Sequence, residues 1–325
     1  MTSIDKTTAS RLFRLMCEIR AFEQVAARRY SNGDLPGFIH LSLGQEACAA
    51  GACVVLGAED FITSTHRGHG HCLAKGADAR LMLAELFAKA QGYGKGRAGS
   101  MHIADVSSGV LGANGIVGQS MGLGIGAALS LQIRKVSGVV IAFFGEGASG
   151  TGIAHETMNM AAIWKLPIVF FCEANRFAEL SPFSTHVSVP NIASRASAYG
   201  FPGVTVNGED VAAVYLTVKA AVERARAGEG PTLIEAKTFR WHGHYEGDPQ
   251  VYKTAEEKAD GQSFDPIARM RERASELGGL TQGELDKIET EANAMIAEAE
   301  AWAEGLQGPA PATMTEDVYA EADNG

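Results

Sequence analysis

The chain has 325 residues, 46% hydrophobic and 20% charged, so it can bury a large core. Its net charge of −10, with no cluster of Lys and Arg, argues against a nucleic-acid-binding protein. The five cysteines form no CxxC pair, no apolar run reaches the roughly 20 residues of a membrane span, and no signal-peptide pattern opens the chain, so we expect a cytoplasmic protein without a membrane partner.

The N-terminal third begins with apolar residues at helical spacing, which predict a long helix over residues 6–29. A second helix of small residues is expected at 46–56, with His40 just before it. A lone histidine ahead of a helix is more often structural than catalytic. The residues around His40 therefore assign it no role by themselves.

A histidine-rich segment follows a predicted strand at residues 61–65. His66, Arg67, His69 and His71 alternate there with glycines. Histidines two residues apart, without a Cys or carboxylate partner, make an incomplete zinc site. An anion site suits the segment better, because the Arg67 guanidinium can bind two phosphate oxygens at once.

The stretch at residues 112–134, GANGIVGQSMGLGIGAALSLQIR, places small residues along one face of a predicted helix. Such a face allows two backbones to approach closely, or a flat ligand to lie against the main chain. Gln119, Ser120 and Arg134 interrupt it, which argues against a membrane helix. Either use makes the stretch an interface.

The centre of the chain predicts a strand, a glycine turn, a helix and a second strand over residues 139–173. The turn GEGASGTG places several backbone N–H groups at a helix N-terminus, an arrangement that binds phosphate. Glu146 in the turn and Asn175 after the second strand offer oxygen ligands to one small hard cation. The unit therefore predicts a diphosphate held through a divalent metal.

The same turn has a competing interpretation. Residues 145–150 satisfy GxGxxG after a strand, the dinucleotide-binding fingerprint, and Glu173 would then hold a ribose. That fingerprint normally lies in the first α/β unit of a chain, and it explains neither Asn175 nor the distant Arg67 and Arg240. An NAD-dependent oxidoreductase is accordingly the weaker hypothesis.

The last third continues the alternation of strands and helices. A buried strand at residues 231–241 delivers Arg240 and His244 past its carboxyl end, where functional groups of open parallel sheets collect. Residues 245–262 have no apolar periodicity and predict a long surface loop. Residues 265–304 predict charged helices that form a solvated tail packing on a partner. With no linker visible, we expect one domain over 1–325, with a helical arm at 1–35 and a helical tail at 264–325.

The motif GEGASGTG followed by CEAN, with Asn175 lying 29 positions after Glu146, resembles the thiamine diphosphate motif of α chains of 2-oxo acid dehydrogenase E1 components. The stretches GFIHLSLGQEA, TSTHRGHGHCLAKG, GSMHIADVSSGVLGANGIVG, NMAAIWKLP, RWHGHYEGDP and DVYAE resemble the family in the same order. Within it, THRGHGH and HYEGDPQVYKT are similar to acetoin dehydrogenase α subunits, with the pyruvate enzyme a near relative. The resemblance implies an α/β thiamine-diphosphate-binding fold, a mostly parallel central sheet with helices on both faces.

The resemblance also implies roles for individual residues. Glu146 and Asn175 would ligate Mg²⁺ by their side chains and Phe177 by its carbonyl. The residues expected to hold the diphosphate are Gly147 and Ala148 through backbone N–H groups, Arg67 and Arg240 through charge, and His66 where relatives often carry Tyr.

For the remaining site residues, the resemblance implies positions around the ring system of the cofactor. Gly115 and Val117 would meet the aminopyrimidine through the main chain. His244 would be the acid/base or orienting group beside the thiazolium, and His40 would line the acyl pocket. The resemblance thus reverses the first interpretation of His40.

By the same resemblance, the chain is the α subunit of a thiamine-diphosphate- and Mg²⁺-dependent acetoin or 2-oxo acid dehydrogenase. A glutamate from a separate β chain would activate the aminopyrimidine in an α2β2 assembly, and the acetyl unit would pass to a lipoyl acyltransferase, E2. The residues do not separate acetoin from pyruvate as the substrate.

Three positions depart from the family pattern: Glu146 stands where Asp is usual, Ala174 replaces the first Asn of an Asn-Asn pair, and Phe177 replaces a Tyr. The extra methylene of Glu146 bears on metal affinity, since Mg²⁺ demands near-octahedral geometry. Tyr245 occupies the place of a regulatory Ser of some relatives, which argues against kinase control there. A degenerate, non-catalytic α chain is the hypothesis that these departures leave open.

Overall fold

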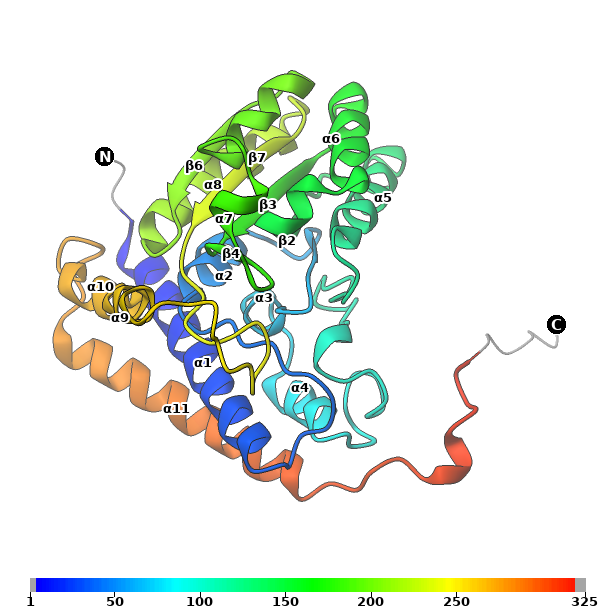
Figure 1. Ribbon diagram of the computed structural model, residues 1–325, viewed down its shortest axis with the longest axis vertical. Coiled ribbons are helices and arrows are strands. Elements are labelled where there is room, and N and C mark those ends of the chain that lie inside the picture. Colours follow the sequence, from blue (N-terminus) through cyan, green and yellow to red (C-terminus); the bar gives the residue numbers. More distant parts are fainter. Residues whose placement is uncertain (1–3, 319–325) are drawn as a thin grey trace.

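The protein is organised around a five-stranded parallel sheet (Figure 1). The structure, a computed structural model, describes residues 4–318, except for the side chains of residues 260 and 262. In spatial order the strands are β1 (Phe61–Thr63), β2 (Val140–Gly145), β3 (Ile168–Ala174), β7 (Thr232–Lys237) and β6 (Gly203–Asn207). Every neighbouring pair is parallel, which confirms the expected sheet.

Helices cover both faces of this sheet, as expected. Phe143 and Phe171 face one side, where they pack in a core with α2 (Glu46–Cys53) and α8 (Val211–Arg226). Their neighbours Phe144 and Phe170 face the other, towards α5 (Gln119–Ile133) and α6 (Gly152–Trp164). Strands buried on both faces explain why their sequences are nearly continuous apolar runs.

The long helix near the C-terminus packs one face on its own chain, so the expectation of a tail solvated apart from this chain is wrong for it; its packing on a partner stays a prediction. Helix α11 (Gln282–Glu304) lies beside α1 (Lys6–Ser31), the orange and blue helices of Figure 1. Its buried residues include an apolar stripe that recurs every three or four positions: Leu285, Ile288, Ala292, Ile296, Ala299 and Ala303. Because several residues of that stripe are small alanines, the sequence of the helix indicated a more polar surface than its buried face has.

The structure also differs from the prediction of a surface loop over residues 245–262. Its second half is helix α9 (Ala255–Ser263), which begins with a capping box: Thr254 accepts from the Glu257 backbone, and Glu257 accepts from the Thr254 backbone. This Thr-x-x-Glu signal was visible in the sequence and outweighs the missing apolar period.

Shorter elements complete the fold. They are α3 (His69–Lys75), α4 (Ala79–Leu86), α7 (Phe183–His186), α10 (Pro266–Arg273), the antiparallel pair β4 (Phe177–Ala178) and β5 (Ser181–Pro182), and the 3-10 helices η1 (Ser100–His102), η2 (Glu146–Gly150), η3 (Ile192–Tyr199) and η4 (Pro311–Thr313). Among the described residues, no helix is long and apolar enough to cross a membrane. The last three residues of DVYAE, and the end of the predicted tail, lie outside the described residues.

Candidate active site

One cavity of about 360 Å³ lies past the carboxyl ends of the central strands, the usual place for ligands in parallel α/β sheets. All of the residues that the sequence nominated contribute to its lining: His40, His66, Arg67, Gly115, Val117, Glu146, Gly147, Ala148, Asn175, Phe177, Arg240 and His244. The fold therefore brings together residues that are up to 204 positions apart in the chain.

The first side of the cavity holds two side-chain oxygens, one carboxylate and one amide, that have no hydrogen-bond partner. Glu146 lies in η2, and its Oε2 accepts a 2.8 Å hydrogen bond from the Asn175 backbone N–H. Its Oε1 and the Asn175 Oδ1 are buried and have no hydrogen-bond partner. Buried polar atoms are normally paired, so this side has the donor set and the unmet need of a hard-cation site.

Burial also changes the protonation of Glu146. Desolvation raises the pKa of this carboxyl to about 7, and the hydrogen bond from the Asn175 backbone opposes the rise only in part. A bound cation would favour the ionised form and lower that pKa. Metal binding and deprotonation of Glu146 are therefore linked.

The second side of the cavity is positive. Arg67 and Arg240 are only 4% and 1% exposed. Arg67 donates to the carbonyls of Leu41 (2.6 Å) and His244 (2.9 Å), and Arg240 donates to the Glu179 carbonyl (2.8 Å) and to the Tyr252 hydroxyl (2.7 Å).

Neither guanidinium forms an ion pair with a carboxylate among the described residues, and the Arg240 Nε has no partner. Desolvation lowers the pKa of both arginines, that of Arg67 to about 9. Buried charge without a counterion is costly. This side therefore has the unmet need of an anion site.

Glycine lines the floor between these two sides. A Cβ on Gly147 would lie 2.8 Å from the Ala178 Cβ, so no side chain fits there. The backbone of Gly147 and Ala148 is consequently open to the cavity. Gly115 and Val117 lie at the rim, in the segment that leads into α5.

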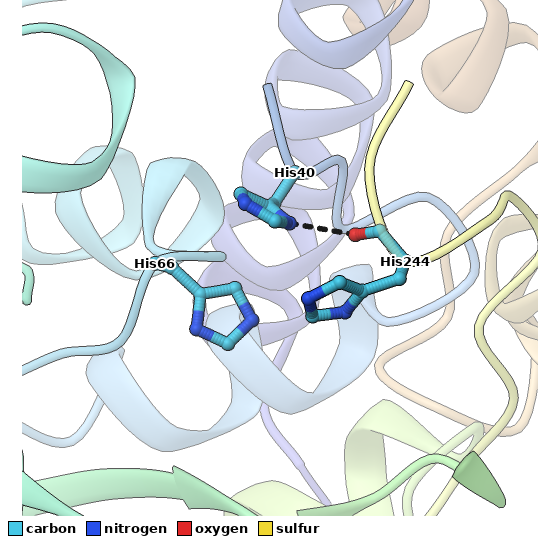
Figure 2. A group of neighbouring side chains, drawn as sticks. All are labelled: His40, His66 and His244. Carbon is cyan, nitrogen blue, oxygen red and sulfur yellow. Dashed lines mark hydrogen bonds between the residues drawn. The ribbon is translucent and has the colours of Figure 1, made fainter. Parts of the chain in front are cut away.

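Three imidazoles meet at the cavity beside the arginines (Figure 2). The ring centroid of His40 lies 4.6 Å from that of His66 and 4.8 Å from that of His244. His40 Nδ1 donates to the His244 carbonyl at 2.7 Å, which leaves its Nε2 as an acceptor. His244 Nδ1 is buried without a partner.

The three histidines are neutral at neutral pH. Burial is the largest cause and the charge of Arg67 the next, and together they lower the pKa of His40 to about 4, of His244 to about 3 and of His66 to about 2. A neutral imidazole can accept a proton from a reacting group, which is what a general base requires.

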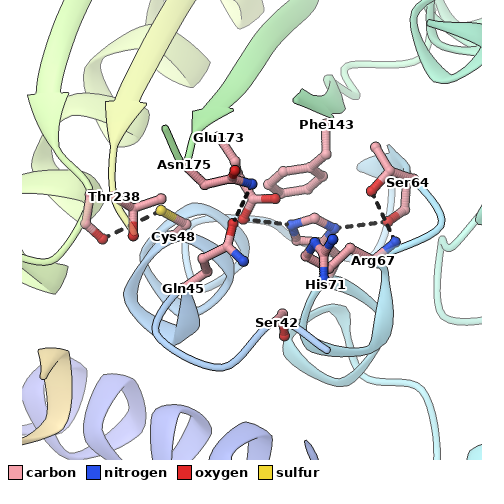
Figure 3. A network of polar contacts seen from close by, with 12 residues as sticks. Ser42, Gln45, Cys48, Ser64, Arg67, His71, Phe143, Glu173, Asn175 and Thr238 are labelled. Atoms are coloured by element: carbon pink, nitrogen blue, oxygen red, sulfur yellow. Dashed lines mark hydrogen bonds and ion pairs between the residues drawn. The ribbon is translucent and has the colours of Figure 1, made fainter. Parts of the chain in front are cut away.

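A buried polar network behind the cavity was missed by the sequence analysis (Figure 3). Asn175 Nδ2 donates to Gln45 Oε1 at 3.1 Å, which turns the Asn175 oxygen towards the cavity. Glu173 lines the cavity but bonds His71 Nε2 at 3.2 Å, and Ser64 bonds the other nitrogen of His71 at 2.8 Å. Nothing in the local sequence pairs these residues, because they come from four separate segments.

Two of the alternatives raised by the sequence involve residues of this network and its neighbours. Among the histidines of THRGHGH, His66 lines the cavity, whereas His69 pairs with buried Glu23 at 3.0 Å and His71 with Glu173. The local His-rich segment is therefore no ligand set. Glu173, which the dinucleotide hypothesis assigns to a ribose, bonds His71 through its Oε1.

The loop after β7 folds back over the second side of the cavity. Asp248 Oδ2 accepts from the His244 backbone N–H and from the Tyr252 hydroxyl, both at 2.7 Å. Lys253 Nζ donates to the carbonyls of Arg240 and His242, both at 2.7 Å. These bonds connect the backbone around Arg240 and His244 to the loop that follows.

The fold and the cavity define a parallel α/β protein with a polar site past the carboxyl ends of its central strands, where unpaired oxygens and buried arginines line one cavity. Residues 14–312 match the dehydrogenase E1 component family, and the chain belongs to that family. Family membership makes it part of a thiamine-diphosphate-dependent oxidoreductase.

Relatives match over nearly the whole chain. The chain is 44% identical to the α subunit of acetoin:2,6-dichlorophenolindophenol oxidoreductase of Bacillus subtilis, over 99% of this chain and 97% of the relative. It is 42% identical to the protein of that name from Cupriavidus necator, over 97% and 95%. It is 36% identical to the pyruvate dehydrogenase E1 component subunit α of Rhizobium meliloti, over 94% and 88%.

Proposed function

We propose that this chain is the α subunit of an acetoin dehydrogenase that depends on thiamine diphosphate and Mg²⁺. The observation that carries the proposal is that two unmet needs occur in one cavity: it is lined by unpaired oxygens of Glu146 and Asn175 and by two buried arginines without a carboxylate partner among the described residues. A diphosphate bridged by a divalent cation meets both needs at once.

The residues present fit such a group. Glu146, Asn175 and the Phe177 carbonyl would hold Mg²⁺, with Gln45 keeping the Asn175 oxygen turned to the metal. Arg67 and Arg240 would neutralise the phosphates. Thiamine diphosphate, when bound, supplies a carbon nucleophile that also acts as an electron sink.

The histidines are placed to handle protons and to orient the substrate. His244 is held through its own backbone, by Asp248 on its N–H and by His40 and Arg67 on its carbonyl. These bonds position its backbone, so that its neutral imidazole lines the cavity and would serve as the acid/base group. His40, with Nδ1 committed, would offer Nε2 to the acyl group of the substrate.

A β subunit would complete the site. The family resemblance assigns the glutamate that activates the aminopyrimidine to the β chain, and the rim of the cavity is open and apolar here: Ile116 and Val117 are 68% and 56% exposed. Large exposed apolar residues beside a site are typical of an interface. We infer an α2β2 assembly in the cytoplasm, with one domain in this chain, transferring the acetyl unit to a lipoyl acyltransferase.

The test uses the co-expressed αβ pair in a dye-reduction assay with thiamine diphosphate and Mg²⁺. We expect acetoin to be oxidised by the pair and not by this chain alone. Equal rates for this chain alone would refute the need for a β subunit. Calorimetry of the pair tests whether the site binds thiamine diphosphate. The absence of binding would favour a degenerate α chain.

A pyruvate dehydrogenase E1 α subunit is the second candidate, favoured by the relatives of that name at 36% identity. The same assay with pyruvate in place of acetoin separates the two. Pyruvate turnover with no acetoin turnover would assign the chain to the second candidate.

A further inference from the structure

The three cavity histidines have an arrangement that the proposed reaction does not require. His40 comes from the segment before α2, His66 follows β1 and His244 follows β7. One ring nitrogen of each lies within 4.8 Å of the other two (Figure 2). Three imidazoles converging from three segments are the ligand set of many zinc centres.

The surroundings of these rings favour ligation by nitrogen. A ligand histidine usually donates its second ring N–H to a carbonyl or carboxylate, which fixes the ring and its tautomer. His40 does this through Nδ1, which donates to the His244 carbonyl at 2.7 Å. His244 Nδ1 is buried and has no hydrogen-bond partner, so this ring keeps one polar atom unsatisfied.

We propose that His40, His66 and His244 form a second metal site, which takes a transition-metal cation of the zinc class and excludes Mg²⁺. Zn²⁺, Co²⁺ and Ni²⁺ accept imidazole nitrogen, whereas Mg²⁺ prefers oxygen and binds through carboxylates, phosphates and water. Three protein ligands leave a fourth position open towards the cavity, where water or a substrate oxygen completes the tetrahedron.

Two features limit the affinity of this site. Tetrahedral zinc holds its nitrogens roughly 3.3 Å apart, given Zn–N bonds of about 2.0 Å, so the rings must rotate inwards from their present spacing. Arg67 and Arg240 repel a cation, and an anion bound to them would relieve that repulsion. The site is therefore suited to reversible binding.

The consequence for activity rests on the proposed function. A cation at this cluster occupies both nitrogens that we assign to proton transfer and substrate contact, so it acts as an inhibitor that excess Mg²⁺ does not remove. The binding test needs neither thiamine diphosphate nor turnover, and its failure is distinguishable from failure of the proposed function.

The experiment titrates Co²⁺ into the full, untagged, EDTA-treated chain in excess Mg²⁺ and follows visible absorption. We expect intense bands of four-coordinate Co²⁺ that saturate at one equivalent and disappear when Zn²⁺ is added. His66→Tyr should weaken Co²⁺ binding at least about tenfold, because one ligand is lost. His186→Asn, which changes a histidine of α7 outside the cavity, should leave it unchanged.

Thermal unfolding provides a second readout that does not depend on colour. Zn²⁺ should raise the melting temperature of the wild-type chain and of His186→Asn, but not that of His66→Tyr. Weak octahedral absorption only, or equal Co²⁺ binding by wild type and His66→Tyr, would overturn the proposal.

Discussion

The two sides of the cavity differ in how burial has shifted their charges. On the Glu146 side, desolvation raises the pKa of a carboxyl to about 7, and two oxygens lack partners. On the Arg67 side, desolvation lowers the pKa of two guanidinium groups and of three imidazoles. Burial thus carries an electrostatic cost on both sides, and a metal diphosphate would relieve it on both.

The largest effect is expected from removal of the Glu146 carboxylate. Glu146→Ala should weaken Mg²⁺-dependent binding of thiamine diphosphate more than about 100-fold, because a metal ligand is lost. Calorimetry on the αβ pair measures it. Glu146→Asp restores the shorter carboxylate usual in this motif and is the matched control, which should bind at least as well as wild type. Unchanged binding in Glu146→Ala would exclude this residue as a ligand.

Substitution of His244 separates chemistry from binding. His244→Asn should lower kcat by about 10² to 10⁴, the usual contribution of an acid/base group, and change the Kd of thiamine diphosphate less than about tenfold. Steady-state dye reduction and calorimetry together give both values. A loss confined to the Kd would instead assign His244 to cofactor binding.

The arginine side should show opposite effects on stability and binding. Arg67→Met should weaken thiamine diphosphate binding about 10- to 100-fold and leave the free chain as stable or more stable, because an unpaired buried charge is removed. Urea unfolding and calorimetry measure the two effects.

A paired arginine outside the cavity is the control for that substitution. Arg226 bonds buried Asp60 at 2.8 Å, so Arg226→Met should cost roughly 2 kcal/mol of stability and leave binding unchanged. If Arg67→Met destabilises the free chain as much as Arg226→Met does, Arg67 is structural.

The pH dependence follows from the raised pKa of Glu146. Because the folded protein holds this proton more tightly than the unfolded chain, stability of the free chain is highest below pH 4.5 for this group and falls as the pH rises to about 7, by about 3 kcal/mol. Mg²⁺ affinity should run the other way, rising up to about tenfold per pH unit below 7 and levelling above it. Glu146→Gln, which carries no titrating carboxyl, should abolish both trends.

The smallest effect is expected from the loop that supports the arginine side. Tyr252→Phe removes one hydroxyl that bonds both Arg240 and Asp248. Loss of these bonds, at about 1 kcal/mol, should weaken thiamine diphosphate binding about fivefold without loss of fold. A change as large as that in Arg67→Met would make the loop, and not the arginines, the main determinant of anion binding.

The central sheet could be predicted from the sequence because its signals are local: apolar runs of strand length, a glycine turn and a helix period. The proximity of Glu146 and Asn175 followed from their places at the ends of two neighbouring parallel strands. Three other features could not be predicted from local signals, because each joins segments distant in sequence. They are the convergence of His40, His66 and His244, the Gln45 contact with Asn175, and the packing of α11 on α1. The roles of the site residues stay predictions.

The most direct test of the two-sided cavity is the linkage between its two ligands. Calorimetry of thiamine diphosphate binding to the αβ pair, with Mg²⁺ and with EDTA, measures it. A metal diphosphate that satisfies both sides predicts weak binding of each ligand alone and the same large increase in the affinity of each when the other is present. Thiamine diphosphate affinity that is unchanged by EDTA would contradict the account.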